Sequence, residues 1–254
     1  MKFVRFEKEG QVRFGILEGD TVTPLSGDLW DEKPLSGNEL RLAQVRLMAP
    51  LEPGNIFCIG RNYSEHAKEL GNNLPEEPLV FMKPTASLLE PEGTISVPLW
   101  AGRIDYEGEL AVVIGRICRN ASEEEAEEAI FGLTCLNDVT ARDLQKKDGQ
   151  WTRAKGFDTF CPLGPWIVKS AETKGRRIET RLNGRVVQSA NTDMMIFPVS
   201  RLVSHISRFT TLRPGDVIAT GTPAGVGPMN AGDEVEVEIE GIGLLRNRVV
   251  AEAS

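Results

Sequence analysis

The sequence predicts a mostly β (α+β) protein with a few short helices. Short apolar or alternating runs recur along the chain, separated by Gly, Pro, Asn or Asp, which is typical of strands joined by turns. Apolar residues at helical spacing are confined to a few segments. At 254 residues the chain is long enough for one large core with a small additional unit.

Residues 1–50 are expected to form a small N-terminal β domain, and residues 51–254 the main domain. "KFVRF" and "VRFGIL" have the pattern of two strands joined by the turn "EKEG". The boundary falls where Pro50, Pro53 and Gly54 separate two short strand-like runs.

Strand signals dominate the main domain. They cover residues 78–83, 94–98, 109–115, 132–139, 164–168, 178–184, 216–221, 233–243 and 244–250. Asn183-Gly184 is the strongest hairpin signal, because both residues tolerate the positive φ of a two-residue turn.

Three segments are predicted to be helical. In "NYSEHAKELG" the glycine, Gly71, closes a short helix. In "SEEEAEEAIFG" Ser122 and Glu125 have the spacing of a capping box. Residues 198–212 carry apolar side chains at helical spacing.

Composition excludes several classes of function. The net charge is −8 and there is no long basic run, so a nucleic-acid partner is not expected. No apolar run approaches the roughly 20 residues of a membrane span, and the first ten residues lack the apolar core of a signal peptide. The cysteines have no paired spacing, so we expect reduced thiols of a cytoplasmic protein.

The stretch "GRIDYEGELAVVIG" places Asp105, Glu107 and Glu109 two residues apart, which on one strand would put three carboxylates on one face. A solvated strand face, or arginine partners such as Arg103, would explain such a pattern. A divalent cation would also explain it, with Asp138 at the end of another apolar strand as a third ligand. Hard oxygen ligands favour Mg²⁺, Mn²⁺ or Ca²⁺ over zinc.

His66 and Glu69 lie three residues apart, on one face of the predicted helix. A carboxylate beside an imidazole orients it and raises its basicity, as a general base for water requires. An ordinary exposed contact is the alternative. The other histidine, His205, is expected to be structural.

Several cations lie near predicted strand ends or turns: Arg61, Lys83, Arg142 and Lys155. As a set, these cations would suit the binding of an anionic substrate. The alternative is that each is an ordinary solvated charge on the surface. The loop "ATGTPAGVGP" either cradles an anion with backbone N–H groups or is a tight structural loop.

In their order, these segments resemble the fumarylacetoacetate hydrolase family. The matching motifs lie between residues 55 and 229: "GRNYSEHAKE", "FMKP", "DYEGELAVVIG", "NDVTARDLQ", "WTRAKGFDTFCPLGPWIV", "MIF" and "LRPGDVIATGTPAGVGPM". The resemblance implies a mixed β-strand roll around a divalent metal, in a homodimer.

The resemblance also assigns roles to individual residues. Glu107, Glu109 and Asp138 would bind Mg²⁺ or Mn²⁺. The catalytic residues would be His66, Glu69 and Lys155, with His66 and Glu69 activating water. Lys155 would also hold the substrate carboxylate together with Arg61. The other pocket residues would be Lys83, Gln145 and Thr222.

The family's activities imply hydrolysis or decarboxylation of short 2,4-dioxo acids through a metal-bound enolate. Such substrates include fumarylpyruvate, acetylpyruvate and oxaloacetate. An isomerase or keto–enol tautomerase acting on oxaloacetate or on diacids like 5-carboxymethyl-2-hydroxymuconate is the alternative, because it needs proton transfer but no attacking water. A metal-stabilised binding protein without turnover is a third hypothesis.

Overall fold

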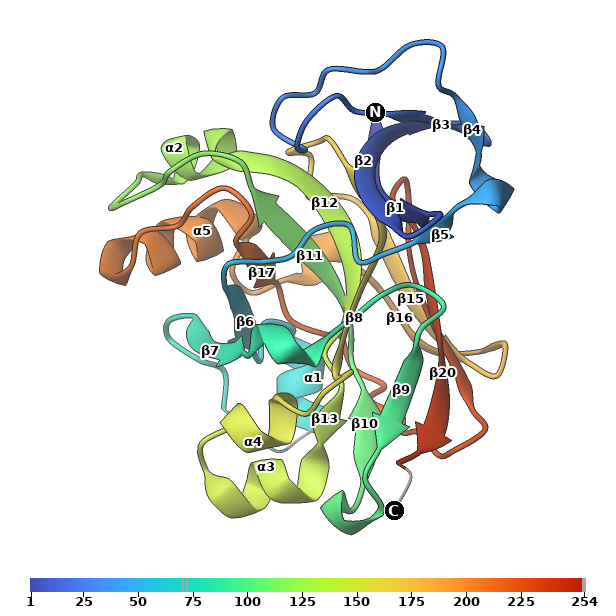
Figure 1. Cartoon of the computed structure of the whole chain (residues 1–254). Coiled ribbons are helices and arrows are strands. Elements are labelled where there is room, and N and C mark those ends of the chain that lie inside the picture. The colour runs from blue at the N-terminus through green and yellow to red at the C-terminus, as the bar shows by residue number, and fades with distance from the viewer. Residues whose placement is uncertain (70, 72, 253–254) are drawn as a thin grey trace.

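The computed structural model describes residues 1–69, 71 and 73–252 (Figure 1). Within these residues a large sheet has the strand order β4-β3-β2-β1-β14-β12-β11-β17-β6-β7, with β5 paired to β1 and β8 to β14. A second sheet has the order β16-β15-β19-β20-β9, and a small third sheet has the order β13-β10-β18. The predicted fold class, mostly β with a few short helices, is confirmed.

The strands of the large sheet are β1 (Lys2–Lys8), β2 (Gln11–Glu18), β3 (Thr21–Pro24), β4 (Leu40–Arg41), β5 (Arg46–Leu47), β6 (Ile56–Gly60), β7 (Leu79–Lys83), β8 (Leu88–Leu89), β11 (Gly108–Ile114), β12 (Ile130–Asn137), β14 (Cys161–Val168) and β17 (Val217–Ala219). The second sheet contains β9 (Thr94–Val97), β15 (Arg177–Leu182), β16 (Arg185–Asn191), β19 (Glu234–Ile239) and β20 (Gly243–Ala251). The third contains β10 (Ile104–Tyr106), β13 (Thr140–Ala141) and β18 (Gly227–Pro228).

The α-helices are short, and four of them lie in two pairs (Figure 1). They are α1 (Ser64–Glu69), α2 (Glu123–Glu128), α3 (Arg142–Asp148), α4 (Thr152–Lys155) and α5 (Val199–Phe209). Helix α2 packs against α5, and α3 packs against α4. None of the helices in the described part of the chain is long and apolar enough to cross a membrane.

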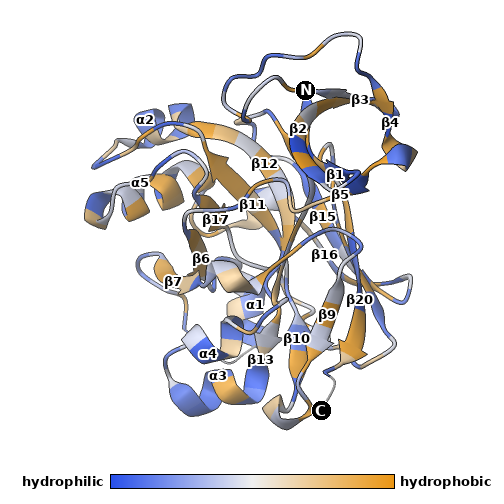
Figure 2. Cartoon of the chain, viewed as in Figure 1, coloured by the Kyte–Doolittle hydropathy of each residue, from blue (hydrophilic) through white to orange (hydrophobic). Residues whose placement is uncertain are grey.

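The main core lies between the large sheet and the second sheet. Val112 of β11 and Leu133 of β12 belong to the same buried cluster as Ile178 of β15 and Val237 of β19. Leu202 of α5 closes one side of this cluster. Figure 2 shows β12 as a mainly hydrophobic strand, as expected for a strand covered on both faces. This packing holds the ends of β11 and β12 in fixed positions.

The N-terminal strands continue the large sheet. Strand β1 pairs antiparallel with β14, with Phe3 opposite Ile167. A separate small core of Val4, Phe6, Leu17 and Val22 lies inside this unit. The boundary at residue 50 stays a prediction.

Several local predictions are confirmed. Asn183 and Gly184 have φ values of +51° and +75° and join β15 to β16 as a two-residue hairpin. Gly71 has a φ of +68° after α1. His205 lies on the predicted helix, α5, with its ring against Phe209, whereas its structural role stays a prediction.

Two expectations were wrong. Residues 104–114 form two strands rather than one, because β10 pairs with β13 and β18 whereas β11 pairs with β12 and β17. The extended strand is interrupted at Glu107, which belongs to neither β10 nor β11. Helices α3 and α4 were not among the three segments predicted to be helical.

The N-terminus of α2 gives a direct stability prediction. Ser122 Oγ accepts from Glu125 N, and Glu125 Oε2 accepts from Ser122 N, so the predicted capping box is present. Ser122→Ala should lower the free energy of unfolding by about 1 kcal/mol. Urea unfolding would measure the change, with Ser36→Ala in an exposed loop as the control. Equal effects of the two substitutions would contradict a capping role.

Candidate active site

Three carboxylates meet where β11 and β12 pair. Glu107 lies in the break before β11, Glu109 is the second residue of β11, and Asp138 follows β12. The antiparallel register places Gly108 opposite Asn137, and Asp138 N donates to Glu107 O at 2.8 Å. The three side chains are buried, and one oxygen from each lies within 4.8 Å of the others.

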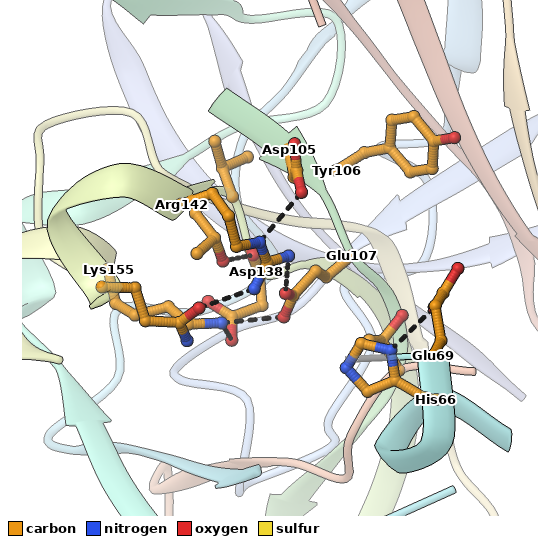
Figure 3. Close-up of polar contacts among 12 residues, drawn as sticks. His66, Glu69, Asp105, Tyr106, Glu107, Asp138, Arg142 and Lys155 are labelled. Atoms are coloured by element: carbon orange, nitrogen blue, oxygen red, sulfur yellow. Dashed lines mark hydrogen bonds and ion pairs between the residues drawn. The ribbon is translucent and has the colours of Figure 1, made fainter. Parts of the chain in front are cut away.

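Buried cations surround two of these carboxylates (Figure 3). Lys155 Nζ lies between Glu107 Oε2 at 2.7 Å and Asp138 Oδ2 at 2.6 Å. Lys83 Nζ donates to Asp138 Oδ1 at 2.6 Å, and Arg142 Nη2 donates to Glu107 Oε1 at 2.5 Å. Burial alone would raise the pKa of Glu107, but Lys155 and Arg142 outweigh burial and hold the pKa well below its usual range.

Glu109 has a different environment. In the described part of the chain no lysine or arginine forms a salt bridge with it, and its Oε2 accepts from the backbone N of Gly221 at 2.8 Å. Burial and the neighbouring Asp138 and Glu107 raise the pKa of the Glu109 carboxyl well above its usual range.

The three carboxylates have the charge, the spacing and the donor atoms that a divalent ion requires. A dication among the three carboxylates would compensate the Glu109 charge that the protein leaves unpaired. Oxygens within 4.8 Å of one another can share an ion at about 2.0–2.6 Å, the usual range for Mg²⁺ and Ca²⁺. The donor set contains oxygen atoms alone, which suits a hard cation. The residues therefore fit a divalent ion.

Asp105 lies on β10 and is not one of the three carboxylates whose oxygens lie within 4.8 Å of one another. Its side chain is fully buried, and its carboxylate accepts from Arg103 Nε at 2.6 Å and from Arg142 Nε at 2.9 Å. The arginine-partner explanation therefore holds for Asp105, as Figure 3 shows for Arg142. Asp105 fixes the guanidinium that contacts Glu107.

The two members of the predicted dyad contact each other on α1. His66 Nδ1 lies 3.3 Å from Glu69 Oε2, and His66 is 5% exposed. With Nδ1–H donating to the carboxylate, Nε2 is left as an acceptor. Both Glu69 oxygens also accept from Gly225 N, at 3.1 and 3.2 Å. In Figure 3 the His66 ring and Lys155 lie on opposite sides of Glu107.

A cavity of about 200 Å³ connects these groups. His66, the three acids and Lys155 line it, and Phe81 and Trp151 supply apolar wall. Of the other predicted pocket residues, the lining includes Arg61, Gln145 and Thr222.

Lys83 is not among the cavity-lining residues in the described part of the chain, and its predicted role in the pocket stays a prediction. Its ammonium donates to Asp138 Oδ1 at 2.6 Å and to Val139 O at 3.2 Å. Lys83 therefore fixes the Asp138 carboxylate.

Sequence reasoning missed the side chains that hold the site together. Asn62 is fully buried, and its Nδ2 donates to Thr220 O at 2.8 Å and to Phe197 O at 3.1 Å. Its Oδ1 accepts from Phe197 N at 2.9 Å. Asn62 thus joins the start of α1 to two distant segments. The signal available in the sequence was the position of Asn62 within the motif "GRNYSEHAKE", next to Arg61.

The fold and the cavity define an enzyme-like site in which a cluster of buried acids and His66 line the same cavity. Residues 55–250 match the family model described as fumarylacetoacetate (FAA) hydrolase C-terminal, and residues 1–50 match the model described as Rv2993c-like, N-terminal. The chain belongs to the fumarylacetoacetate hydrolase family, a family of enzymes.

Solved structures and a characterised relative agree with this membership. A 2-hydroxyhepta-2,4-diene-1,7-dioate isomerase from Mycobacterium marinum is 42% identical with a TM-score of 0.93, and the match covers all of both chains. A maleylpyruvate hydrolase from Sphingobium, solved with manganese and pyruvate, is 30% identical with a TM-score of 0.84 over all of both chains. A 2,4-didehydro-3-deoxy-L-rhamnonate hydrolase from Sphingomonas is 39% identical over 98% of this chain and 96% of that protein.

Proposed function

We propose that this chain is a divalent-metal-dependent enzyme that hydrolyses or decarboxylates short 2,4-dioxo acids. The observation that carries the proposal is that His66, whose Nδ1 contacts Glu69, lines the same cavity as three buried carboxylates. The Sphingobium hydrolase was solved with manganese and pyruvate, which supports a divalent metal as cofactor and a 2-oxo acid as substrate in this proposal. The proposal includes Mg²⁺ or Mn²⁺ as the ion, acylpyruvates or oxaloacetate as substrates, and a homodimer as the assembly.

A divalent ion held by Glu107, Glu109 and Asp138 would supply Lewis-acid stabilisation of negative charge developing on the substrate. His66 Nε2 takes a proton from water while Glu69 holds the ring through Nδ1. The water oxygen bonds to the distal carbonyl carbon, and the bond between that carbon and the adjacent methylene breaks. A proton then returns to the methylene carbon, so an acylpyruvate and water give a carboxylic acid and pyruvate.

The cations of the cavity have separable roles. Lys155 uses two of its three N–H donors on Glu107 and Asp138, which leaves one for a substrate oxygen. Arg61 lines the cavity with its guanidinium 6.0 Å from the Trp151 ring centroid, and no carboxylate in the described residues forms a salt bridge with it. It is suited to bind a substrate carboxylate.

Isomerisation or keto–enol tautomerisation is the second candidate, favoured by the 42% identity to the Mycobacterium marinum isomerase. It requires the same stabilisation of negative charge, followed by reprotonation at another atom. Isomerisation therefore needs no attacking water. The same is true of oxaloacetate decarboxylation, which belongs to the first proposal and releases carbon dioxide.

Proton NMR of acetylpyruvate and oxaloacetate, with Mg²⁺ and with a chelator, tests the proposal. We expect metal-dependent formation of pyruvate, and the faster substrate distinguishes hydrolase from decarboxylase. Keto–enol exchange without new products would instead favour the tautomerase. Full turnover in chelator would contradict the metal requirement.

A further inference from the structure

Two segments that contribute side chains to the site run beside each other: the ligand segment, residues 106–109, and the glycine loop, residues 221–225. Three hydrogen bonds join them directly. They are Gly221 N to Glu109 Oε2 at 2.8 Å, Thr222 Oγ1 to Gly108 O at 2.9 Å, and Tyr106 Oη to Gly225 O at 3.0 Å. The position of each segment therefore depends on the other.

Gln188 of β16 reaches both segments from the second sheet. It is 1% exposed, and its Oε1 accepts from Gly108 N at 3.0 Å. Its Nε2 donates to Thr222 Oγ1 at 2.9 Å and to Pro223 O at 2.8 Å. Both amide hydrogens and the amide oxygen are thus used, and Gly108 is the residue between two predicted metal ligands.

The glycine loop also reaches the dyad. Gly225 N donates to both oxygens of Glu69, which holds His66. Gly225 has a φ of +101°, and a Cβ at this position would lie 2.2 Å from Val187 O. A side chain would therefore push the loop away from β16, so the loop can follow this path only with glycine here.

We propose that Gln188 is a positioning residue that fixes the spacing between the metal ligands and the dyad. Its amide holds the ligand segment at Gly108 and the glycine loop at Thr222 and Pro223, and the loop in turn holds Glu69. The inference rests on the proposed function for its catalytic meaning. Partners behind metal ligands typically change metal affinity or activity by about 10–100-fold when they are lost.

The test compares two buried amides of the same sheet. Gln188→Met keeps the approximate size and removes the hydrogen bonds. Asn247→Leu is the matched control: Asn247 of β20 is 2% exposed, and its Nδ2 donates to Glu90 O and Gly93 O, both at 3.0 Å. Both changes leave buried backbone groups without partners, so both should lower Tm.

Two readouts separate positioning from general stability. Calorimetric titration with Mn²⁺, without substrate, should show binding weakened about 10–100-fold by Gln188→Met and unchanged by Asn247→Leu. Hydrogen exchange should become faster in peptides covering the ligand segment and the glycine loop in Gln188→Met alone. If Gln188→Met does not fold, Gln188→Glu keeps the acceptor for Gly108 N and removes both Nε2 donors.

Equal effects of the two substitutions on Mn²⁺ affinity and exchange, or no effect of the Gln188 change on either, would overturn the proposal. If the unmodified protein does not bind Mn²⁺, the proposed metal dependence fails. The exchange comparison then decides the positioning role by itself: faster exchange confined to the Gln188 variant supports it, and unchanged exchange overturns it.

Discussion

Replacing Glu109 with glutamine should abolish metal-dependent turnover and, at the same time, make the metal-free protein more stable. Glu109 is buried beside Glu107 and Asp138, and among the described residues no lysine or arginine pairs with it. A neutral amide removes the repulsion among these carboxylates, which we expect to raise the free energy of unfolding by about 1 kcal/mol. It also removes an anionic ligand, and kcat/KM should fall by at least about 10³-fold, or roughly 4 kcal/mol.

Glu107→Gln is the matched comparison. Glu107 pairs with Lys155 and Arg142, so its neutralisation leaves buried cations without part of their counter-charge. Loss of one partner of a buried pair costs about 3–5 kcal/mol, so this variant should lose both activity and stability. Urea unfolding in chelator and turnover with saturating Mg²⁺ measure the two effects. Equal destabilisation by both substitutions would contradict the distinct environments of the two acids.

Replacing His66 with alanine should separate hydrolysis from enolisation. His66 is the group placed to take a proton from water, and general-base catalysis contributes about 10²–10⁴-fold. We expect acetylpyruvate hydrolysis to fall by that factor, while metal-dependent exchange of the substrate's methylene protons with deuterated solvent persists. Lys155 and the three carboxylates that would hold the ion, Glu107, Glu109 and Asp138, remain in this variant, so stabilisation of the enolate charge would be retained.

Proton NMR in deuterated buffer measures both rates in one sample. Glu69→Gln provides the second variant: it retains an acceptor for Gly225 N and weakens the polarisation of His66, so hydrolysis should fall less than in His66→Ala. Full hydrolytic activity of His66→Ala would show that another group activates water.

Local signals made part of this fold predictable. The Asn183-Gly184 turn and the Ser122 capping box depend on neighbouring residues alone, so the sequence contains all that determines them. The proximity of the Glu107 and Glu109 carboxylates could be expected from their spacing in the sequence. The position of Asp138 beside them could be expected from its place after an apolar strand.

Other features depend on distant partners. The break at Glu107 exists because β10 and β11 pair with different strands, and a continuous alternation of residues contains no sign of that choice. Lys83 and Lys155 are buried because carboxylates from remote elements compensate them, although lysine is ordinarily exposed. Gln188 contacts the site only through the packing of β16 against it.

The most direct test of the metal site is the anomalous diffraction of a crystal soaked in Mn²⁺. We predict one peak bounded by Glu107, Glu109 and Asp138, at about 2.0–2.6 Å from an oxygen of each. A crystal with no peak there, in which Lys155 Nζ still bridges Glu107 and Asp138, would contradict the account. The ion pairs would then explain the buried Glu107 and Asp138 without a metal ion.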